Sequence, residues 1–293
     1  ALPPEEYREI ATLARRFDET RAQRSLEVAA MTPLAAITET SAPMVSLPTG
    51  VPAVQIQLLG PVDVVAPGPV EDPRRALLTE VVVAAALHRD GLHDAVLRSA
   101  VWPRGVSDDV VADVIRDVNR WLGGSRFLQA DDGRWCLDDD VHTDWDVFRA
   151  LVSDGTGVGE ADRLVRALDL ARGEAFSAVP AGRYRWLAFH RAARDARVLV
   201  TTVARRAAEI LDGDPKRAGA ALHAGLKLAP TAEVLWRDML RLVASRDPSS
   251  LAVTIAALDD ALARNGVRRA EPETDALIEQ LAPQMNRDAG RTA

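Results

Sequence analysis

The stretch that most constrains the fold is an amphipathic segment, residues 108–122, followed directly by a hairpin pattern. Asp108 is expected to cap the N-terminus of this helix, and Gly123-Gly124 to end it. Two short strand patterns follow at residues 127–129 and 135–137, separated by the turn Asp131-Asp132-Gly133. Apolar residues recur at helical spacing along the helix and form one stripe that would face a core: Val111, Ile115, Val118 and Leu122.

A helix that leads directly into a two-stranded hairpin is typical of the end of a winged-helix domain, where this helix lies in the DNA major groove. The polar face of this helix, however, carries as many acids as bases: Asp113, Arg116, Asp117 and Arg120. Residues 54–145 hold nine arginines against sixteen acidic residues, so the whole net charge of −7 lies in this segment. Because DNA affinity comes largely from neutralising phosphates, this charge argues against ordinary DNA binding.

The composition limits the classes of protein to which the chain can belong. The chain has 293 residues, room for about two domains, and its hydrophobic content of 47% is that of a globular protein. No apolar run approaches the roughly 20 residues that span a bilayer. Cys136 is the only cysteine, which excludes an internal disulfide and a cysteine zinc site. The histidines show no zinc spacing, and no nucleophile–base pair stands out. We therefore expect no metal, no cofactor and no enzymatic activity.

The pattern predicts a mainly α protein in which a winged-helix domain with β-hairpins precedes an α-helical repeat domain. In the first domain we expect a hairpin over 54–65 and helices over 73–88, 92–101, 108–122 and 145–152. In the second we expect helices over 160–172, 184–212, 215–228, 231–245, 248–265 and 272–282. The predicted organisation is an N-terminal helix (1–31), a linker (32–53), the winged-helix domain (54–152), a hinge (153–159), the helical-repeat domain (160–283) and a tail (284–293).

Several short motifs occur in an order that resembles the actinobacterial antibiotic-regulatory proteins, which join a winged helix to a tetratricopeptide-like bacterial transcriptional activator domain. They are Leu58-Leu59-Gly60-Pro61-Val62-Asp63-Val64, Arg75-Ala76-Leu77-Leu78, Ala100-Val101-Trp102-Pro103, Asn119-Arg120-Trp121-Leu122-Gly123, Gly133-Arg134-Trp135-Cys136-Leu137-Asp138, Asp144-Trp145-Asp146-Val147-Phe148 and Ala167-Leu168-Asp169-Leu170-Ala171-Arg172-Gly173-Glu174-Ala175-Phe176. The resemblance covers roughly residues 54–282. It implies transcription regulation through DNA binding in the cytoplasm. Some relatives carry this unit at the end of a membrane-anchored protein, and residues 1–53 could be the remainder of such a tether.

The resemblance implies base contacts by Arg116 and Arg120 and phosphate contacts by Arg126 and Arg134. The competing interpretation is that Arg116 and Arg120 pair with Asp113 and Asp117 on a solvated helix face. The acidic residues at the family's basic positions favour a protein-interaction module whose DNA-binding face is degenerate. A sequence-specific DNA-binding regulator is the alternative.

Protein contact has its own candidates. Asp113 and Asp117 are candidate contact residues, and Trp121 is a third if it is exposed rather than buried in the core. The stretch 183–206 is basic, with seven arginines against one acid, and it could attract the acidic winged helix within or between chains. A solvated helix face is the alternative for this stretch. Its candidate contact residues are Arg183, Arg191, Arg194 and Arg197. The expected partner is another protein, the chain's own second domain, or a second copy.

Overall fold

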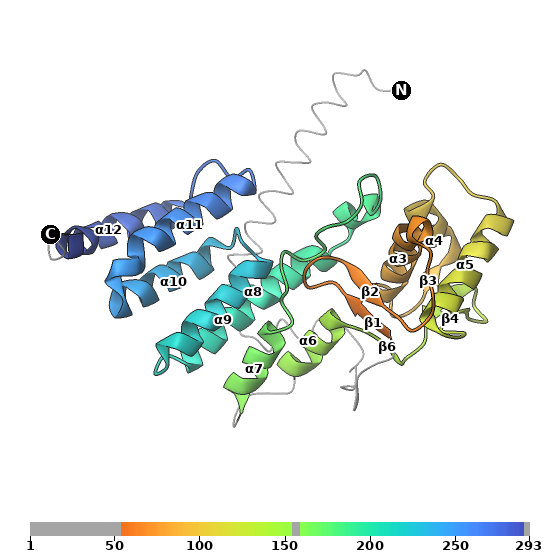
Figure 1. The fold of residues 1–293 in the computed structure, drawn as a ribbon, viewed down its shortest axis with the longest axis horizontal. Helices are drawn as coiled ribbons and strands as arrows, with labels where there is room; N and C mark the ends of the chain where they lie inside the picture. Colours follow the sequence, from red (N-terminus) through yellow and green to blue (C-terminus); the bar gives the residue numbers. More distant parts are fainter. Residues whose placement is uncertain (1–53, 154–158, 290–293) are drawn as a thin grey trace, which may run out of the picture.

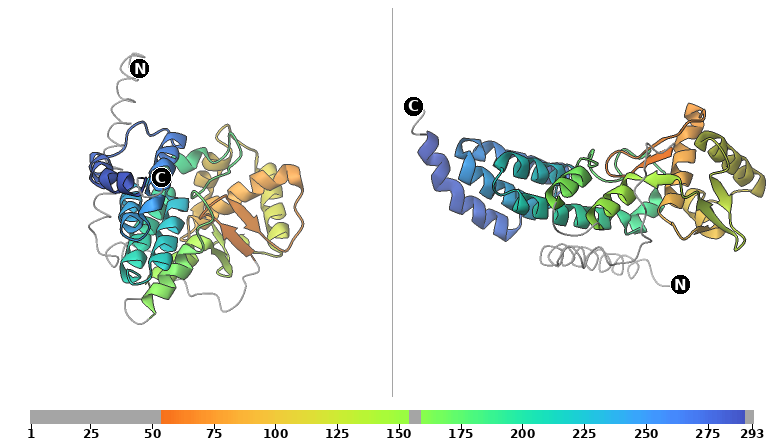
Figure 2. Two further views of the ribbon diagram at one scale, coloured as in Figure 1. Left: turned by 60° about the vertical axis from the view of Figure 1, so that its left-hand side comes forward. Right: turned by 90° about the horizontal axis from the view of Figure 1, so that it is seen from below.

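The computed structural model describes residues 54–153 and 159–289. The predicted N-terminal helix 1–31, the linker 32–53, most of the hinge 153–159 and the last residues of the tail lie outside the described residues. The described chain is mainly helical, as predicted, with a strand-containing region first and a helical domain after it. The molecule is elongated, with the strands at one end and the C-terminal helices at the other (Figures 1 and 2).

The opening sheet has three strands in the order β2-β1-β6. The predicted hairpin is present: β1 (Val54–Gln57) pairs antiparallel with β2 (Asp63–Val65). The third strand, β6 (Val141–Thr143), pairs parallel with β1. The sequence indicated no strand at β6, because its three residues follow a run of acids and its partner strand lies far earlier in the chain.

The winged helix follows the order helix, strand, helix, helix and hairpin. Its helices are α3 (Asp72–Ala86), α4 (Asp94–Val101) and α5 (Asp108–Leu122). Its sheet has the order β3-β5-β4, from β3 (Leu92–His93), β4 (Phe127–Gln129) and β5 (Arg134–Leu137). The predicted bounds of α5 and of strand β4 are confirmed, β5 begins one residue earlier than predicted, at Arg134, and Gly123 ends α5 in the left-handed conformation at φ 82°.

Two local predictions about the winged helix were wrong. Asp108 does not cap α5: the N-cap is Ser107, and its side chain makes no capping hydrogen bond. The segment predicted as one helix from residue 92 begins with strand β3, and α4 starts at Asp94. The side chain of His93 caps α4 by accepting a hydrogen bond from the Ala95 N–H at 3.3 Å. The pairing of β3 with β5 determines where α4 starts, and a local sequence pattern cannot predict this pairing.

The rest of the described chain is a stack of helices in which α8, α9 and α10 pack in sequence (Figure 1). A Cβ on Gly225 of α9 would lie 2.6 Å from the Ala204 Cβ of α8, so glycine permits this close approach. The elements are α6 (Asp144–Ser153), α7 (Glu160–Leu168), η1 (Arg185–Phe189), α8 (Ala192–Ile210), α9 (Pro215–Leu228), α10 (Glu233–Arg246), η2 (Pro248–Ser250), α11 (Leu251–Arg264) and α12 (Pro272–Ala289).

The prediction of one helix over 184–212 was wrong. The segment is split into the 3-10 turn η1 and helix α8, because Tyr184 has a positive φ of 56° and His190 is extended. Helix α7 also ends at Leu168, earlier than expected. The residues from 169 to 184 have no long regular element and run over the winged helix. The buried core is nevertheless one cluster from β1 to α12, so the two halves pack against each other.

Candidate interaction surface of the winged helix

Helix α5 and its hairpin lie at the end of the molecule farthest from α10, α11 and α12 (Figures 1 and 2). The apolar stripe of α5 faces the core as predicted. Trp121 belongs to it: this residue is only 1% exposed, and the guanidinium of Arg75 lies 5.6 Å from its ring centroid. Trp121 therefore cannot be a contact residue, and that candidate role was wrong. The face that remains exposed consists of Asp108, Asp109, Val110, Ala112, Asp113, Arg116 and Arg120.

Both arginines of this face pair with an acid one turn earlier. Arg116 Nη1 lies 2.7 Å from Asp113 Oδ1, and Arg120 Nη1 lies 2.9 Å from Asp117 Oδ1. Asp117 also pairs with Arg74 of α3, which fixes its carboxylate against the winged-helix core. The predicted pairing within the helix is confirmed. Exposed pairs of this kind contribute only about 0.3–0.5 kcal/mol to the stability of the fold. Their main effect is to neutralise the charge of the arginines on this face.

The two predicted phosphate contacts hold the wing together. Arg126 Nη2 lies 2.9 Å from Asp140 Oδ2, and its Nη1 donates to the Leu122 carbonyl at the end of α5. Arg134 Nη1 donates to the Asp90 carbonyl at 3.2 Å, and its Nε lies 3.5 Å from Asp132 Oδ2. These arginines thus have partners inside the winged helix.

Asn119 is a residue that the sequence reasoning missed. Its side-chain oxygen accepts hydrogen bonds from the N–H groups of Arg126 and Phe127, at 2.9 and 2.8 Å, and its amide donates to the Phe127 carbonyl at 2.8 Å. The amide thereby fixes strand β4 to helix α5. The sequence signal for this role was the position of Asn119, an amide side chain between the exposed and the apolar faces of α5.

Acidic side chains outnumber counter-ions at this end of the molecule. Four aspartates have no ion-pair partner among the residues that the structure describes: Asp109 on α5, Asp131 in the wing turn, and Asp138 and Asp139 after β5. All four are exposed. We call α5, the wing turn and these four aspartates the acidic end. Its arginines are paired and its surplus charge is negative.

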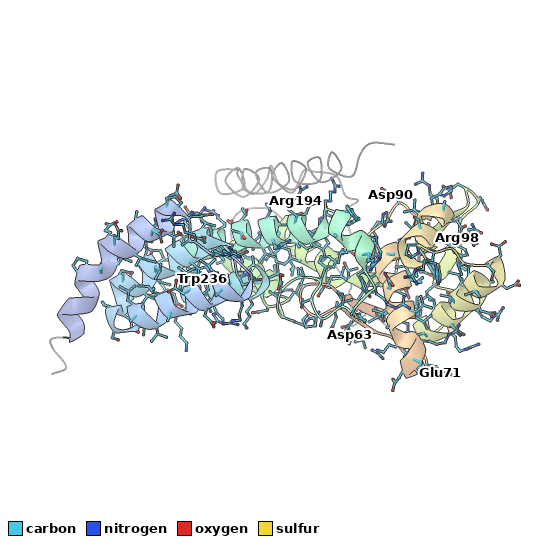
Figure 3. The ribbon with its side chains drawn as sticks, turned by 90° about the horizontal axis from the view of Figure 1, so that it is seen from above. Asp63, Glu71, Asp90, Arg98, Arg194 and Trp236 are labelled. Carbon is cyan, nitrogen blue, oxygen red and sulfur yellow. The ribbon has the colours of Figure 1, made fainter. Side chains whose placement is uncertain are left out.

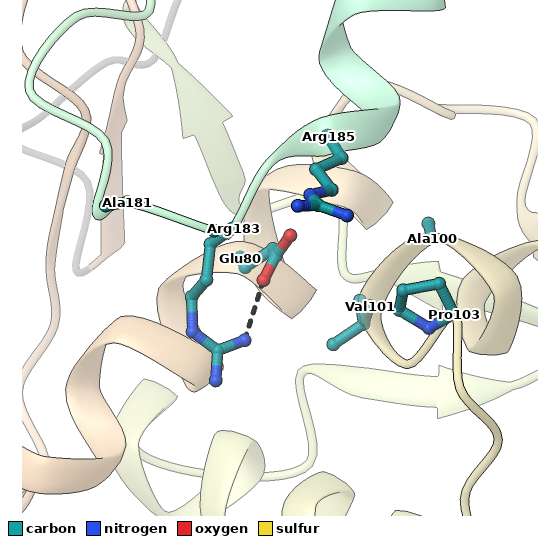
Figure 4. Close-up of a pocket in the computed structure, with 8 residues that line it drawn as sticks. Glu80, Ala100, Val101, Pro103, Ala181, Arg183 and Arg185 are labelled. Carbon is teal, nitrogen blue, oxygen red and sulfur yellow. Dashed lines mark hydrogen bonds and ion pairs between the residues drawn. The ribbon is translucent and has the colours of Figure 1, made fainter.

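The winged helix is fixed to the chain that follows by a buried carboxylate on α3. Glu80 is 2% exposed, and it accepts hydrogen bonds from Arg183 Nη1 at 2.8 Å, the Tyr184 N–H at 2.6 Å and Trp186 Nε1 at 3.2 Å (Figure 4). A lone acid inside the apolar run of α3 was the sequence signal for it. Arg183, a predicted interaction residue, therefore lies in the contact between the winged helix and the chain that follows it.

A second carboxylate, on Asp144 at the start of α6, joins the opening sheet to the segment after α7. It accepts hydrogen bonds from the Leu58 and Leu59 N–H groups at 2.7 and 3.0 Å, and Arg172 Nη2 lies 3.5 Å away. Burial raises the pKa of Asp144, and the two backbone N–H groups oppose this shift. Glu80 and Asp144 together hold the winged helix in one orientation on the helical part.

The other arginines of the basic stretch lie on or just before α8. Arg191 and Arg194 share one acid, Asp195, with nitrogen–oxygen distances of 3.4 and 3.9 Å. Arg197 donates to the Ala193 carbonyl at 3.3 Å. Figure 3 shows Arg194 along α8, between the C-terminal helices and the winged helix that carries Arg98.

A pocket of about 320 Å³ lies between α3, α4 and the segment before η1 (Figure 4). Its lining is Glu80, Ala100, Val101, Pro103, Ala181, Gly182, Arg183 and Arg185.

Residues 54–153 and 159–289 contain no group of three or more His, Cys, Asp or Glu side chains that could hold a metal ion. Across the same residues, every helix is too short or too polar to cross a membrane.

No protein-family model matches the chain, and no curated protein matches it in sequence. Among solved structures, the chain is similar to Mycobacterium tuberculosis EmbR, determined in complex with a low-affinity phosphopeptide. The TM-score is 0.48 and the identity 18%, over 79% of this chain and 65% of EmbR, so less than two thirds of that protein is spanned. A similarity of this size decides neither the family nor the function of this chain.

Proposed function

We propose that the chain is a non-enzymatic regulatory protein of two domains, a winged helix (54–152) and a helical repeat (160–283), whose acidic end contacts another protein rather than DNA. The observation that carries the proposal is the state of the arginines on α5. Arg116 and Arg120 are paired within the helix, at 2.7 and 2.9 Å, while Asp109 in the first turn of the same helix has no counter-ion among the described residues. The proposal implies that the protein acts without a cofactor, either in the cytoplasm or as the soluble part of a membrane-anchored protein.

Electrostatics gives the physical reason. Double-stranded DNA carries one charge per about 1.7 Å of helix axis, and specific binders typically neutralise about 6–10 phosphates. The acidic end exposes surplus aspartates, which repel phosphates rather than neutralise them: Asp109, Asp131, Asp138 and Asp139. A protein surface with basic or amide groups fits this end better, because charge complementarity steers association and selects partners.

The second candidate is a sequence-specific DNA-binding regulator, with Arg116 and Arg120 on bases and Arg126 and Arg134 on phosphates. One observation favours it: the arginine of each α5 ion pair is exposed, with side chains 65% and 60% accessible. Exposed pairs are weak, so a base edge could replace Asp113 or Asp117 as the acceptor.

Fluorescence anisotropy with labelled duplexes from the gene's own upstream region separates the two functions. We expect no saturable binding at about 150 mM salt, and only weak, sequence-independent binding at about 50 mM. The test variant is Arg116→Ala with Arg120→Ala. The matched control is Arg241→Ala with Arg264→Ala, which removes two exposed ion-paired arginines from α10 and α11. Tight binding that the test variant loses and the control keeps would make the DNA-binding regulator the correct function.

A further inference from the structure

A second surface, on η1 and the start of α8, carries the opposite charge. We call it the arginine–phenylalanine surface: Arg185, Phe189, Arg191, Arg194 and Arg197. Phe189 is 93% exposed, more than any other large apolar residue of the described chain. All four arginines are exposed as well. A fully exposed aromatic ring among cations is a common feature of protein contact surfaces, because burying the ring and pairing the cations both favour binding.

The cations of this surface are poorly compensated. Asp195 is the acid that faces them, and it is shared between Arg191 at 3.4 Å and Arg194 at 3.9 Å. Arg197 donates to the Ala193 carbonyl, which leaves its charge without a counter-ion in the described chain. Arg185 lies at the rim of the pocket (Figure 4), again without an ion-pair partner among the described residues. The surface therefore holds positive charge in excess.

The acidic end has the complementary composition. The acidic end and the adjoining strand β4 also expose two apolar residues, Val110 next to Asp109 on α5 and Leu128 on β4, which are 45% and 53% exposed. Each surface thus combines apolar area with charge, and the signs of the two charges are opposite. Complementary charges attract over a Debye length of about 10 Å at moderate salt, and the apolar residues supply contact once water is excluded.

The two surfaces cannot meet within one molecule in this fold. Glu80 binds Arg183, Tyr184 and Trp186 directly ahead of Phe189, and Asp144 holds the opening sheet to the segment after α7. These anchors fix the winged helix with α5 at its outer end, away from α8 (Figure 1). A contact between the two surfaces therefore requires two molecules.

We propose that the acidic end of one copy of this chain docks on the arginine–phenylalanine surface of a second copy. The inference rests on the proposed function, because it names the protein that the acidic end contacts. Phe189 is the apolar anchor, and Arg194 and Arg197 pair with aspartates of the acidic end. The contact is head-to-tail, so a pair of copies keeps one free surface of each kind, and assembly grows with concentration instead of stopping at a symmetric dimer.

Sedimentation velocity on the full chain tests this proposal. At about 50 mM salt and about 200 µM protein we expect a mass above the 31.7 kDa monomer, and at about 500 mM salt a return to it. Phe189→Ser should weaken assembly by about tenfold or more. The matched control is Val253→Ser on α11, which removes another exposed apolar residue, 72% accessible, and should leave assembly unchanged.

A charge exchange makes the test specific. Arg194→Glu with Arg197→Glu gives a chain with two acidic surfaces. Asp131→Lys, Asp138→Lys and Asp139→Lys together give a chain with two basic ones. We expect each variant alone to stay monomeric and their equimolar mixture to assemble. Monomers at all concentrations, assembly indifferent to salt, or a mixture that stays monomeric would each overturn the proposal.

The failure of this proposal and that of the proposed function are distinguishable. A monomeric chain without DNA affinity would refute self-association and leave a different protein as the partner of the acidic end. Duplex DNA bound by the wild type and lost in Arg194→Glu with Arg197→Glu would assign the arginine–phenylalanine surface to nucleic acid and overturn the inference.

Discussion

Replacing Glu80 by alanine tests whether one buried carboxylate fixes the winged helix to the helical part. Its carboxylate accepts hydrogen bonds from Arg183 Nη1 at 2.8 Å, the Tyr184 N–H at 2.6 Å and Trp186 Nε1 at 3.2 Å. A buried donor that loses its acceptor costs about 1–3 kcal/mol. Arg183 is 31% exposed and Trp186 is half-buried, so water partly replaces Glu80 there, and the full penalty applies to the Tyr184 N–H. We expect Glu80→Ala to lower the free energy of unfolding by about 3 kcal/mol.

Urea unfolding followed by tryptophan fluorescence measures this loss, and hydrogen exchange at the Tyr184 amide localises it. Glu80→Gln should fall between wild type and alanine, because it keeps one acceptor oxygen but turns an amide toward Arg183. The matched control is Glu71→Ala, an exposed glutamate at the start of the same helix whose side chain makes no capping hydrogen bond. Glu80→Ala within about 0.5 kcal/mol of wild type, with unchanged protection of the Tyr184 amide, would refute the reasoning.

Three further perturbations address the same junction. Asp144→Asn should lower the unfolding free energy in urea by about 1–2 kcal/mol at neutral pH, because one of the two side-chain oxygens that accept from backbone N–H groups is replaced by an amide nitrogen. Gly60→Ala should cost about 1–3 kcal/mol in urea, because the new Cβ would lie 2.9 Å from the Arg172 Cβ. Burial, and then the His88 ring 5.2 Å away, lower the pKa of His190, so the folded protein binds fewer protons than the unfolded chain. Stability should be complete above pH 6.5 and fall as the pH drops through it, and His190→Gln should flatten this dependence of Tm.

Two of the three have a matched control on the same chain. Gly213→Ala adds a Cβ where nothing lies within 4 Å, and should leave stability near wild type. His223→Gln removes an exposed histidine from α9, and should leave the acid dependence of Tm intact. A Tm profile that keeps its slope below pH 6.5 in His190→Gln would contradict the assignment to His190. For Asp144→Asn, an unchanged urea midpoint at neutral pH would show that Asp144 does not join the sheet to the later segment.

The sequence alone determined the elements whose cause is local. The apolar period of residues 108–122 and the left-handed Gly123 set the bounds of α5, and the turn that ends in Gly133 set the wing. The spacing of acids and arginines on α5 also predicted the ion pairs that neutralise its exposed face. Such features depend on residues within about one helical turn or one tight turn of each other, so their pattern is visible in the chain.

The tertiary structure decided everything that depends on a distant partner. Strands β3 and β6 are too short to form alone, and they exist because β5 and β1 pair with them. The 3-10 turn η1, which replaces the first part of the predicted helix, begins where Glu80, far earlier in the chain, holds the Tyr184 N–H. The burial of Trp121 was also invisible in the sequence, since either face of a helix can carry an aromatic ring. Periodicity reports which residues share a face, whereas only packing decides what that face meets.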